Sequence, residues 1–296
     1  MVALQGLKQK NKMSFYGAAY EFIKEKKIDS IRLSTRPDYI DRETLKRLKK
    51  YKVKTIELGV QSANDFILER AGRGHTFADV KRASKLIRWY GFTLGHQMMI
   101  GLPESTWQDE IETAKKLIKL KPKMVRIYPV LVIKNTKLAK DYESGKYKPL
   151  NLTKAVEISK ELVLMFNQKN IEVIRIGLQN TDSIKDPSSD DSEVIAGPYH
   201  PAFGQLVESS FWYDDLSNKI KKINAKVKEV RIIVNSSDVS NVIGQKKENI
   251  NKIKEIYDVD VKVVGSDKMK KGKSKLEIVK TYADYLEEEE KVCLKK

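Results

Sequence analysis

Between residues 18 and 180 the chain alternates short strand-like runs with segments of helical periodicity, and this alternation limits the folds that it can adopt. Apolar residues recur three and four positions apart in the helical segments, as in 77–90. Strands separated by helices of about 10–15 residues are typical of parallel βαβ units. The sequence therefore predicts an α/β domain on a parallel sheet, whose five strands are Ser30–Thr35, Val53–Gln61, Phe92–Gly101, Met124–Val132 and Ile171–Leu178.

The rhythm breaks between residues 180 and 215, where a loop rich in Pro, Ser and Asp precedes a stretch rich in Gly, Pro and aromatic residues. A lysine-rich helix follows, then a strand at 230–235, two short helices around Gly244 and a strand at 259–264. This change of pattern predicts a second, smaller α+β domain that begins near residue 214.

Positive charge is concentrated in this second part. The formal net charge of the 296 residues is +17, and Lys219–Lys275 contains 16 Lys or Arg against 7 Asp or Glu. A local excess of this kind favours a nucleic-acid partner, although a solvated lysine-rich surface would show the same composition.

Several kinds of site are excluded or disfavoured by composition. The one cysteine, Cys293, rules out a disulfide framework, a cysteine-based zinc site and a self-sufficient iron–sulfur cluster. The three histidines lack the short spacing of a metal-ligand pair, so we expect no metal site. The sequence shows neither a secretory signal nor an apolar run that could span a bilayer, so we expect no membrane association and a cytoplasmic location.

Polar residues stand at the ends of the first three predicted strands. Strand alternation puts Glu57, Gly59 and Gln61 on one face, Gln97 lies within the third strand, and Ser34 ends the first. Ligand sites of parallel α/β domains lie at the carboxyl ends of the strands. Such polar groups either cap the strands or converge on a polar small molecule, and both interpretations stay open at this point.

Four motifs in order make part of the chain recognisable. These are IRLSTRPDYID (31–41), ELGVQS (57–62), RGHT (73–76) and GHQMMIGLPES (95–105). With IRIGLQNTD (174–182) and AGPYHPAFGQLVES (196–209), they resemble the radical S-adenosylmethionine (SAM) superfamily. The resemblance is to its Elp3-like branch, with coproporphyrinogen dehydrogenase as a more distant relative.

The resemblance implies a partial (β/α) barrel that holds a 4Fe–4S cluster and SAM at the strand ends, where reductive cleavage of SAM yields a radical. Gln61 and Arg73 are similar in position to the SAM-contacting Gln and Arg of the family. Gln97 stands where relatives have a ribose-binding Asp, and Glu57 and Ser34 are implied as neighbours of the SAM amino acid or ribose.

The chain departs from the family pattern in its cluster ligands. The CxxxCxxC loop and the glycine-rich segment that binds the SAM amino group are both missing. We therefore expect that the first two βα units are absent, that residues 1–17 match nothing in the family, and that this chain alone does not catalyse radical chemistry. A truncated gene product, one half of a split enzyme whose partner chain carries the cysteines, and a cluster-free descendant retained for binding would each explain the departure.

A second resemblance covers the basic part. Val242-Ile243 precede the loop Gly244-Gln245-Lys246-Lys247 in a strand–helix–helix–strand order, which resembles the KH RNA-binding domain and its GxxG loop. The second glycine is replaced by lysine here, which adds attraction for phosphate. A packing module with a chance glycine turn is the alternative. The expected domains are thus a segment 1–17, a partial radical SAM barrel with its extension at 18–213, and a KH-like module at 214–296.

Two functions follow from these resemblances. The first is a radical SAM protein related to the modification of RNA, plausibly tRNA, but without its cluster ligands. The second is a cluster-free protein that only binds RNA. Chemistry on a porphyrinogen, as in the coproporphyrinogen oxidase relatives, is disfavoured because the basic module has no evident role with a small tetrapyrrole.

Overall fold

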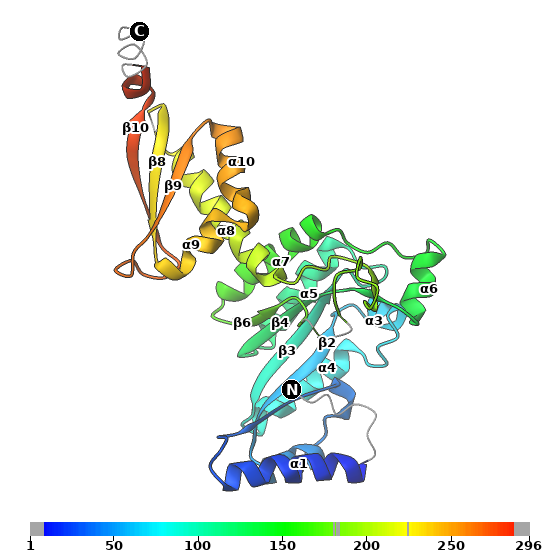
Figure 1. The fold of residues 1–296 in the computed structure, drawn as a ribbon. Helices are drawn as coiled ribbons and strands as arrows, with labels where there is room; N and C mark the ends of the chain where they lie inside the picture. The colour runs from blue at the N-terminus through cyan, green and yellow to red at the C-terminus, as the bar shows by residue number, and fades with distance from the viewer. Residues whose placement is uncertain (1–8, 180, 182–183, 224, 287–296) are drawn as a thin grey trace. The chain divides into compact units, whose positions relative to one another are not determined.

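The chain forms two compact units that divide after Phe203. The computed structural model describes residues 9–179, 181, 184–223 and 225–286 (Figure 1). The division falls earlier than the boundary expected near residue 214, because the helix from Phe203 to Lys221 contributes Leu216 and Ile220 to the apolar core of the second unit. Residues 1–8 of the expected segment 1–17 lie outside the described residues, as does Cys293.

The first unit is an α/β domain. Its elements follow the order expected from the sequence, with additions: α1 (Gln9–Lys24), β1 (Ile31–Thr35), η1 (Pro37–Tyr39), α2 (Arg42–Lys50), β2 (Val53–Gln61), α3 (Asp65–Arg70), α4 (Phe77–Trp89), β3 (Thr93–Ile100), α5 (Trp107–Lys119), β4 (Met124–Pro129), β5 (Val132–Ile133), α6 (Lys137–Glu143), α7 (Leu152–Asn167), β6 (Glu172–Ile176) and β7 (Val194–Ala196).

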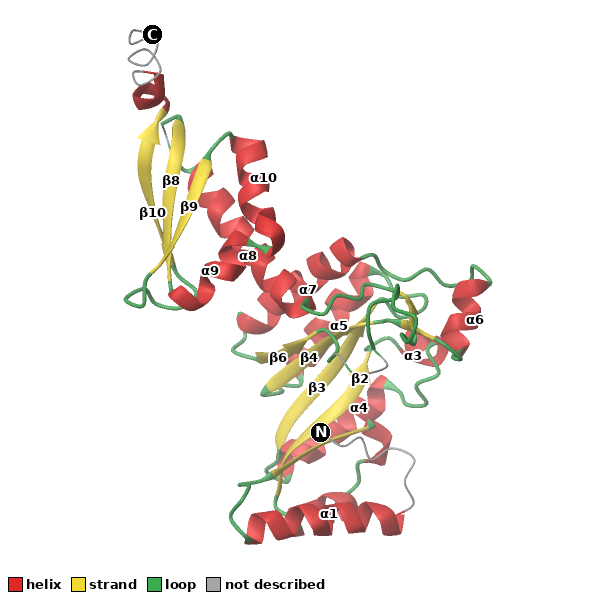
Figure 2. Ribbon diagram, viewed as in Figure 1, coloured by secondary structure: helices red, strands yellow, loops and turns green. Residues whose placement is uncertain are grey.

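The five long strands form one parallel sheet in the order β1-β2-β3-β4-β6 (Figure 2). The fold class expected from the sequence is therefore confirmed as α/β with a parallel sheet. Helices α2, α4, α5 and α7 pack against the sheet, and their buried residues alternate with exposed ones at helical spacing.

The two faces of this sheet differ in chemistry because side chains alternate along each strand. The face toward the helices is apolar, with fully buried residues such as Leu58, Met98 and Ile127. The opposite face carries polar side chains at successive strands, which contact one another: Arg32, Ser34, Glu57, Gln97, Arg126 and Tyr128.

Three features of the first unit were not expected from the sequence. The run Met124–Val132 is interrupted at Pro129, so β4 ends there and Val132–Ile133 pairs instead with β7 in a separate antiparallel ladder. Helix α6 begins after Thr136, whose side chain accepts a hydrogen bond from the Ala139 amide. Helix α1 begins at Gln9 rather than near residue 18.

The second unit has the strand–helix–helix–strand order expected from the sequence and one further strand. Its elements are α8 (Phe203–Lys221), β8 (Val227–Val234), η2 (Ser236–Asp238), α9 (Val239–Ile243), η3 (Gln245–Lys247), α10 (Glu248–Tyr257), β9 (Asp260–Gly265) and β10 (Ser274–Thr281). Strand β8 is central, parallel to β9 and antiparallel to β10.

The core of this unit lies between the sheet and its helices. Val230, Ile232 and Val234 of β8 pack with Val242 of α9 and Ile253 of α10. The lysine-rich run after β9 is a turn that leads into β10. The sequence pattern did not indicate this strand, because its apolar residues Leu276, Ile278 and Val279 are interrupted by Glu277 and flanked by lysines. None of the helices in the described part of the chain combines the length and apolar character needed to cross a bilayer.

Candidate functional site

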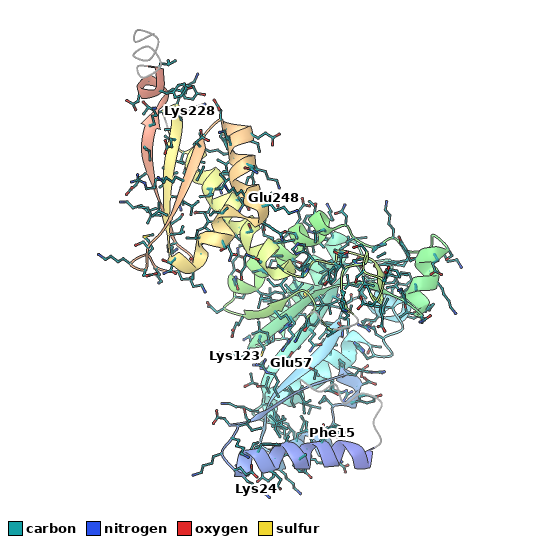
Figure 3. The ribbon with its side chains drawn as sticks, in the orientation of Figure 1. Phe15, Lys24, Glu57, Lys123, Lys228 and Glu248 are labelled. Atoms are coloured by element: carbon teal, nitrogen blue, oxygen red, sulfur yellow. The ribbon has the colours of Figure 1, made fainter. Side chains whose placement is uncertain are left out.

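A buried charge pair lies on the polar face of the parallel sheet. The carboxylate of Glu57 on β2 accepts hydrogen bonds from Nε and Nη2 of Arg126 on β4, at 2.6 and 3.2 Å. Glu57 is fully buried and Arg126 is 8% exposed (Figure 3). Gly95 on the strand between them leaves the space for this contact, because a Cβ there would lie 2.8 Å from Cγ of Glu57.

Gln97 and Ser34 complete this network. Nε2 of Gln97 donates to Oγ of Ser34 at 2.9 Å and to the Glu57 carboxylate at 3.2 Å. The structure thus brings together three of the five residues expected at a SAM site, and it shows them in contact with one another and with Arg126. Their assignment to SAM stays a prediction.

The other two residues, Gln61 and Arg73, lie nearer the carboxyl end of the sheet. Gln61 ends β2 with a left-handed φ of 69°, and its buried Oε1 has no hydrogen-bond partner in the described structure. Arg73 contacts Sδ of Met99 through Nη2 at 2.7 Å, and its buried Nε is also without a partner there. Buried polar atoms of this kind favour a missing polar ligand.

Arg73 also lines a hollow. This cavity of about 420 Å³ lies where β3 and β4 end, and Met99, Leu102, Val130 and Leu138 supply apolar walls. Burial, and then the neighbouring charge of Arg36, lower the pKa of Arg73. A carboxylate that entered the hollow would therefore find a partly desolvated guanidinium, which binds carboxylates in a two-pronged geometry.

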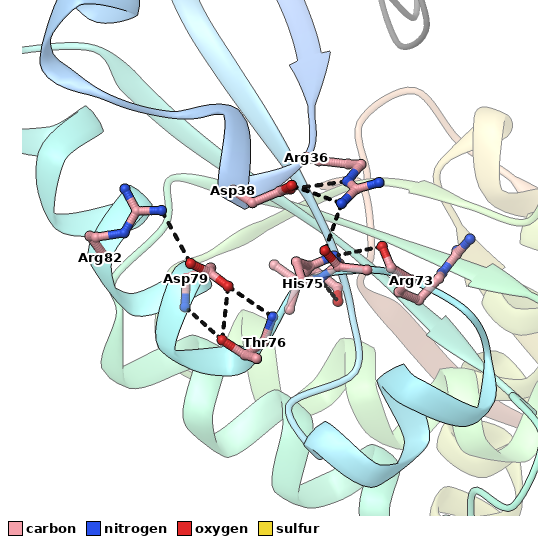
Figure 4. Close-up of polar contacts among 9 residues, drawn as sticks. Arg36, Asp38, Arg73, His75, Thr76, Asp79 and Arg82 are labelled. Atoms are coloured by element: carbon pink, nitrogen blue, oxygen red, sulfur yellow. Dashed lines mark hydrogen bonds and ion pairs between the residues drawn. The ribbon is translucent and has the colours of Figure 1, made fainter.

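The loop RGHT is held in place by contacts of the residues that follow Arg73 (Figure 4). Arg36 pairs with Asp38 and donates to the Gly74 carbonyl at 2.6 Å, and Nε2 of His75 lies 3.2 Å from the Val60 carbonyl oxygen. Thr76 and Asp79 form a capping box that starts α4. The residues that follow Arg73 are consequently fixed to β1, β2 and the start of α4.

The GLP turn after β3 is anchored by a second buried carboxyl group. Oε1 of Glu110 accepts hydrogen bonds from the Gly101 amide and from Oγ of Ser105, both at 2.9 Å. Burial raises the pKa of Glu110 to about 7, although these hydrogen bonds oppose the rise. Tyr147 donates to the Gly101 carbonyl at 2.6 Å, and burial raises its pKa as well.

His96 lies on the opposite face and takes no part in this site. Its Nε2 is 2.9 Å from Oγ of Ser84 on α4, and complete burial lowers its pKa to about 3. A neutral histidine packed between sheet and helix is a structural residue.

The residues of this chain do not fit a 4Fe–4S cluster. A cluster is held by several cysteine thiolates, the sequence contains one, and the described residues contain no group of three His, Cys, Asp or Glu suited to a metal ion. SAM is a different case, because Arg73 lines a cavity, and Oε1 of Gln61 and Nε of Arg73 are buried without a partner in the described structure. These atoms suit a ligand that carries a carboxylate and hydrogen-bond donors.

The loop GQKK joins α9 and α10 in the second unit. Gly244 has φ +78°, and a Cβ there would lie 3.0 Å from the Asn249 amide nitrogen, so this position requires glycine. Lys246 and Lys247 are left-handed as well and exposed. No side chain caps the amino end of α10, where the Glu248 amide donates to the Gln245 carbonyl.

A buried asparagine fixes this loop. Nδ2 of Asn249 lies within 3.0 Å of both the carbonyl and the hydroxyl oxygen of Ser209 on α8, and 3.2 Å from the Val242 carbonyl. Oγ of Ser209 in turn donates to the Asn241 carbonyl at 2.9 Å. Three helices are thereby joined behind the loop, and the loop is held rigid for binding.

Sequence reasoning missed several residues of these sites. Arg126 could have been found as the one charged residue in the apolar run MVRIYP. Asn249 and Ser209 are 40 residues apart, and no local pattern indicates that they meet.

Comparisons with known proteins agree with this arrangement. Residues 12–117 match the model of the Radical SAM superfamily, 122–212 match the Radical_SAM C-terminal domain, and 229–282 match the KH domain. The tRNA uridine(34) acetyltransferase of Methanocaldococcus jannaschii is 36% identical over 129 residues, which cover 43% of this chain and 24% of that protein. Human Elongator complex protein 3 is 31% identical over 131 residues, which cover 43% of this chain and 24% of that protein.

A solved structure shows the same likeness. Archaeal Elp3 of Methanocaldococcus infernus, with an N-terminal deletion, superposes with a TM-score of 0.54 at 25% identity. The match covers 64% of this chain and 42% of that one. This chain therefore spans about a quarter of the length of the two curated relatives and less than half of the solved structure.

Proposed function

This chain belongs to the Elp3-like branch of the radical SAM superfamily and carries a KH domain, and from this premise we propose a function in tRNA modification. The KH domain binds single-stranded RNA of the substrate, and the first unit binds SAM beside Gln61 and Arg73. The chain does not hold an iron–sulfur cluster of its own, so it does not cleave SAM unaided.

The exposed loop at 244–247 carries the RNA-binding part of the proposal. Gly244 lets the backbone turn, and the exposed Lys246 and Lys247 provide two cations. Neither lysine lies within ion-pair distance of a carboxylate in the part of the chain that the structure describes, so their charge is available to phosphate. Contacts of this type position the strand and select bases weakly.

The substrate class in the proposal comes from the relatives. Proteins that the chain resembles in Methanocaldococcus jannaschii, Methanocaldococcus infernus and Dehalococcoides mccartyi are named tRNA uridine(34) acetyltransferases. A KH domain in the same chain is consistent with an RNA substrate. Wobble-uridine acetylation itself is not part of the proposal, because this chain spans only a quarter of those enzymes.

RNA binding by the loop is tested with Lys246→Ala/Lys247→Ala and a fluorescent tRNA probe. Each phosphate contact to a single strand contributes about 0.7 to the slope of log affinity against log salt. Loss of two contacts should lower the slope by about 1.4.

The matched control is Lys252→Ala/Lys254→Ala, which removes the same charge from the same helix region. Those two lysines already pair with Glu248 and Asp260, at 2.6 and 2.7 Å. Equal slopes for the two double variants would contradict the assignment of the loop.

SAM binding is tested by calorimetry with SAM and S-adenosylhomocysteine. A hydrogen bond to a charged group contributes about 1.5–3 kcal/mol, so Arg73→Ala should weaken binding by about 10- to 100-fold. Arg47→Ala, at a half-buried residue of α2 that does not line the cavity, serves as the control. Unchanged binding in the Arg73 variant would remove this residue from the site.

The absence of a resident cluster is tested by anaerobic reconstitution with iron and sulfide. The chain should give no 4Fe–4S absorbance, because it has one cysteine. A stable brown product with four irons per chain would refute this part of the proposal.

A further inference from the structure

Two adjoining hollows lie in the first unit, away from the strand ends that form the candidate SAM site. The first, of about 910 Å³, is lined by α4 together with the start of α2 and the end of α5. The second, of about 740 Å³, lies where β3, β4 and β6 begin, which is the end of the strands opposite to the candidate SAM site. Arg88 of α4 lines both hollows, so they form one continuous surface.

This surface, which we call the α4 surface, is strongly cationic. Nine Lys or Arg side chains line the two hollows, and no Asp or Glu does. Lys81, Lys85 and Arg88 follow one another at helical spacing on the exposed face of α4, and Lys123 precedes β4 (Figure 3). Within the described residues, only Arg82 among the nine forms an ion pair, with Asp79 at 3.2 Å. Grooves lined by one sign of charge attract polyanions.

An aromatic ring lies among these cations. Trp89 ends α4 and lines the first hollow, and it is 69% exposed, more than any other large apolar side chain in the described structure. Its ring packs edge-on against Tyr90 at 5.3 Å, and the guanidinium of Arg42 lies 5.7 Å from its centre. The indole is thereby held on one side while most of its surface faces solvent.

We propose that the α4 surface is a second binding site for single-stranded RNA, with Trp89 as a stacking platform for an unpaired base. A positively charged groove that follows the backbone, joined to an aromatic platform, is the arrangement by which proteins bind single strands. An acidic peptide would satisfy the cations but has no need of an exposed indole. A duplex keeps its bases stacked inside and cannot use the ring. The proposal does not rest on the KH loop, because its residues belong to the other unit.

The experiment uses the full chain and a fluorescein-labelled oligoadenosine of twelve nucleotides, with affinity measured by anisotropy. Loss of a base stack corresponds to about 1–3 kcal/mol, so Trp89→Ala should bind about tenfold more weakly or worse. Trp89→Phe, which keeps an aromatic face, should restore most of the affinity. Because the side chain is exposed, neither variant should change the circular dichroism spectrum.

The charge contribution is measured with Lys81→Glu/Lys85→Glu. Its matched control is Lys146→Glu/Lys148→Glu, two exposed lysines of the same unit outside both hollows. The α4 pair should lower the salt slope by at least about 1.4, and the control pair should not.

Either of two results would overturn the proposal: equal losses in both lysine pairs, or unchanged oligonucleotide binding in Trp89→Ala. Competition by polyglutamate as strong as that by RNA, with no effect of Trp89→Ala, would identify an acidic protein partner instead and would also overturn it. Repeating the series in Lys246→Ala/Lys247→Ala separates the two sites. If only the loop variant loses affinity, the proposal for the α4 surface is refuted and the KH proposal stands. If only the α4 variants lose affinity, the KH proposal is refuted and the α4 surface stands.

Discussion

The buried carboxyl group of Glu110 makes the stability of the first unit depend on pH, and Glu110→Gln should remove that dependence. The side chain is 4% exposed, and its Oε1 accepts the two hydrogen bonds that hold the GLP turn. Glutamine keeps an acceptor oxygen at the same place and is neutral at every pH. The substitution therefore changes the titration and leaves the contacts of Oε1 intact.

The sign and size of the effect follow from the two pKa values. Burial raises the pKa of Glu110 from 4.5 to about 7, so the native state keeps its proton over a range in which the unfolded chain loses it. The associated stability is fully present below pH 4.5 and is lost as the pH rises to about 7. Each pKa unit corresponds to about 1.4 kcal/mol, so the loss is on the order of 3 kcal/mol.

The assay is urea denaturation of both proteins between pH 5 and pH 8. Trp212, which packs against the core of the second unit, is replaced by Phe in both proteins, so that tryptophan fluorescence follows the first unit. Trp107 begins the helix that contains Glu110. The difference in unfolding free energy between the variant and the wild type cancels the other titrating groups, which both proteins share. We expect the glutamine variant to gain stability relative to wild type as the pH rises, by about 3 kcal/mol at pH 8.

A difference that stays constant from pH 5 to pH 8 would refute the reasoning, since it would mean that Glu110 titrates alike in the folded and unfolded chain. A difference that shrinks with rising pH would show that the native state favours the ionised carboxylate, and the hydrogen bonds from Gly101 and Ser105 would then outweigh burial.

Two further substitutions test the sites. Gly244→Ala should lower the free energy of unfolding by about 1–3 kcal/mol and weaken RNA binding, because an alanine there has a positive φ and its Cβ also meets Asn249. The control is Gly272→Ala, which has a similar φ of 74° but open space around it and should cost less. Chemical denaturation compares the two variants, and equal losses of stability would count against the close contact. Glu57→Gln should destabilise the first unit by about 3–5 kcal/mol, because it leaves the Arg126 charge buried and unpaired. Glu277→Gln, at a half-exposed carboxylate whose partner Lys275 is exposed, should change little. A small effect at Glu57 would show that the network tolerates an amide.

Local pattern was sufficient to predict most elements of both units. The strands at 31–35, 53–61, 93–100 and 172–176 lie within or close to their expected ranges, because buried parallel strands produce apolar runs and the helices between them show a period of 3.6. The failures have physical causes. Pro129 ends β4 inside an apolar run that local pattern predicts as one strand. The apolar residues of β10 are few and flanked by lysines, so their pattern does not indicate a strand.

The candidate sites were predictable in part. Motif position indicated Gln61, Arg73 and the loop at 244–247. In the structure, Gln61 and Arg73 each have a buried polar atom without a partner among the described residues, and Arg73 lines a cavity. Motif position also grouped Ser34, Glu57 and Gln97, but only the sheet register shows that Glu57 meets Arg126, since the two residues stand 69 positions apart in the sequence.

The sequence alone determined the class of fold, the order of the elements and the sign of the charge, because periodicity and composition are local properties of the chain. Tertiary structure decided which polar groups pair and which stay unpartnered, and it brought the cations of α2, α4 and α5 around Trp89. The physical reason is that alternation assigns a side chain to a face, while strand register and helix packing, which depend on the whole core, decide which side chains on that face come within hydrogen-bond distance.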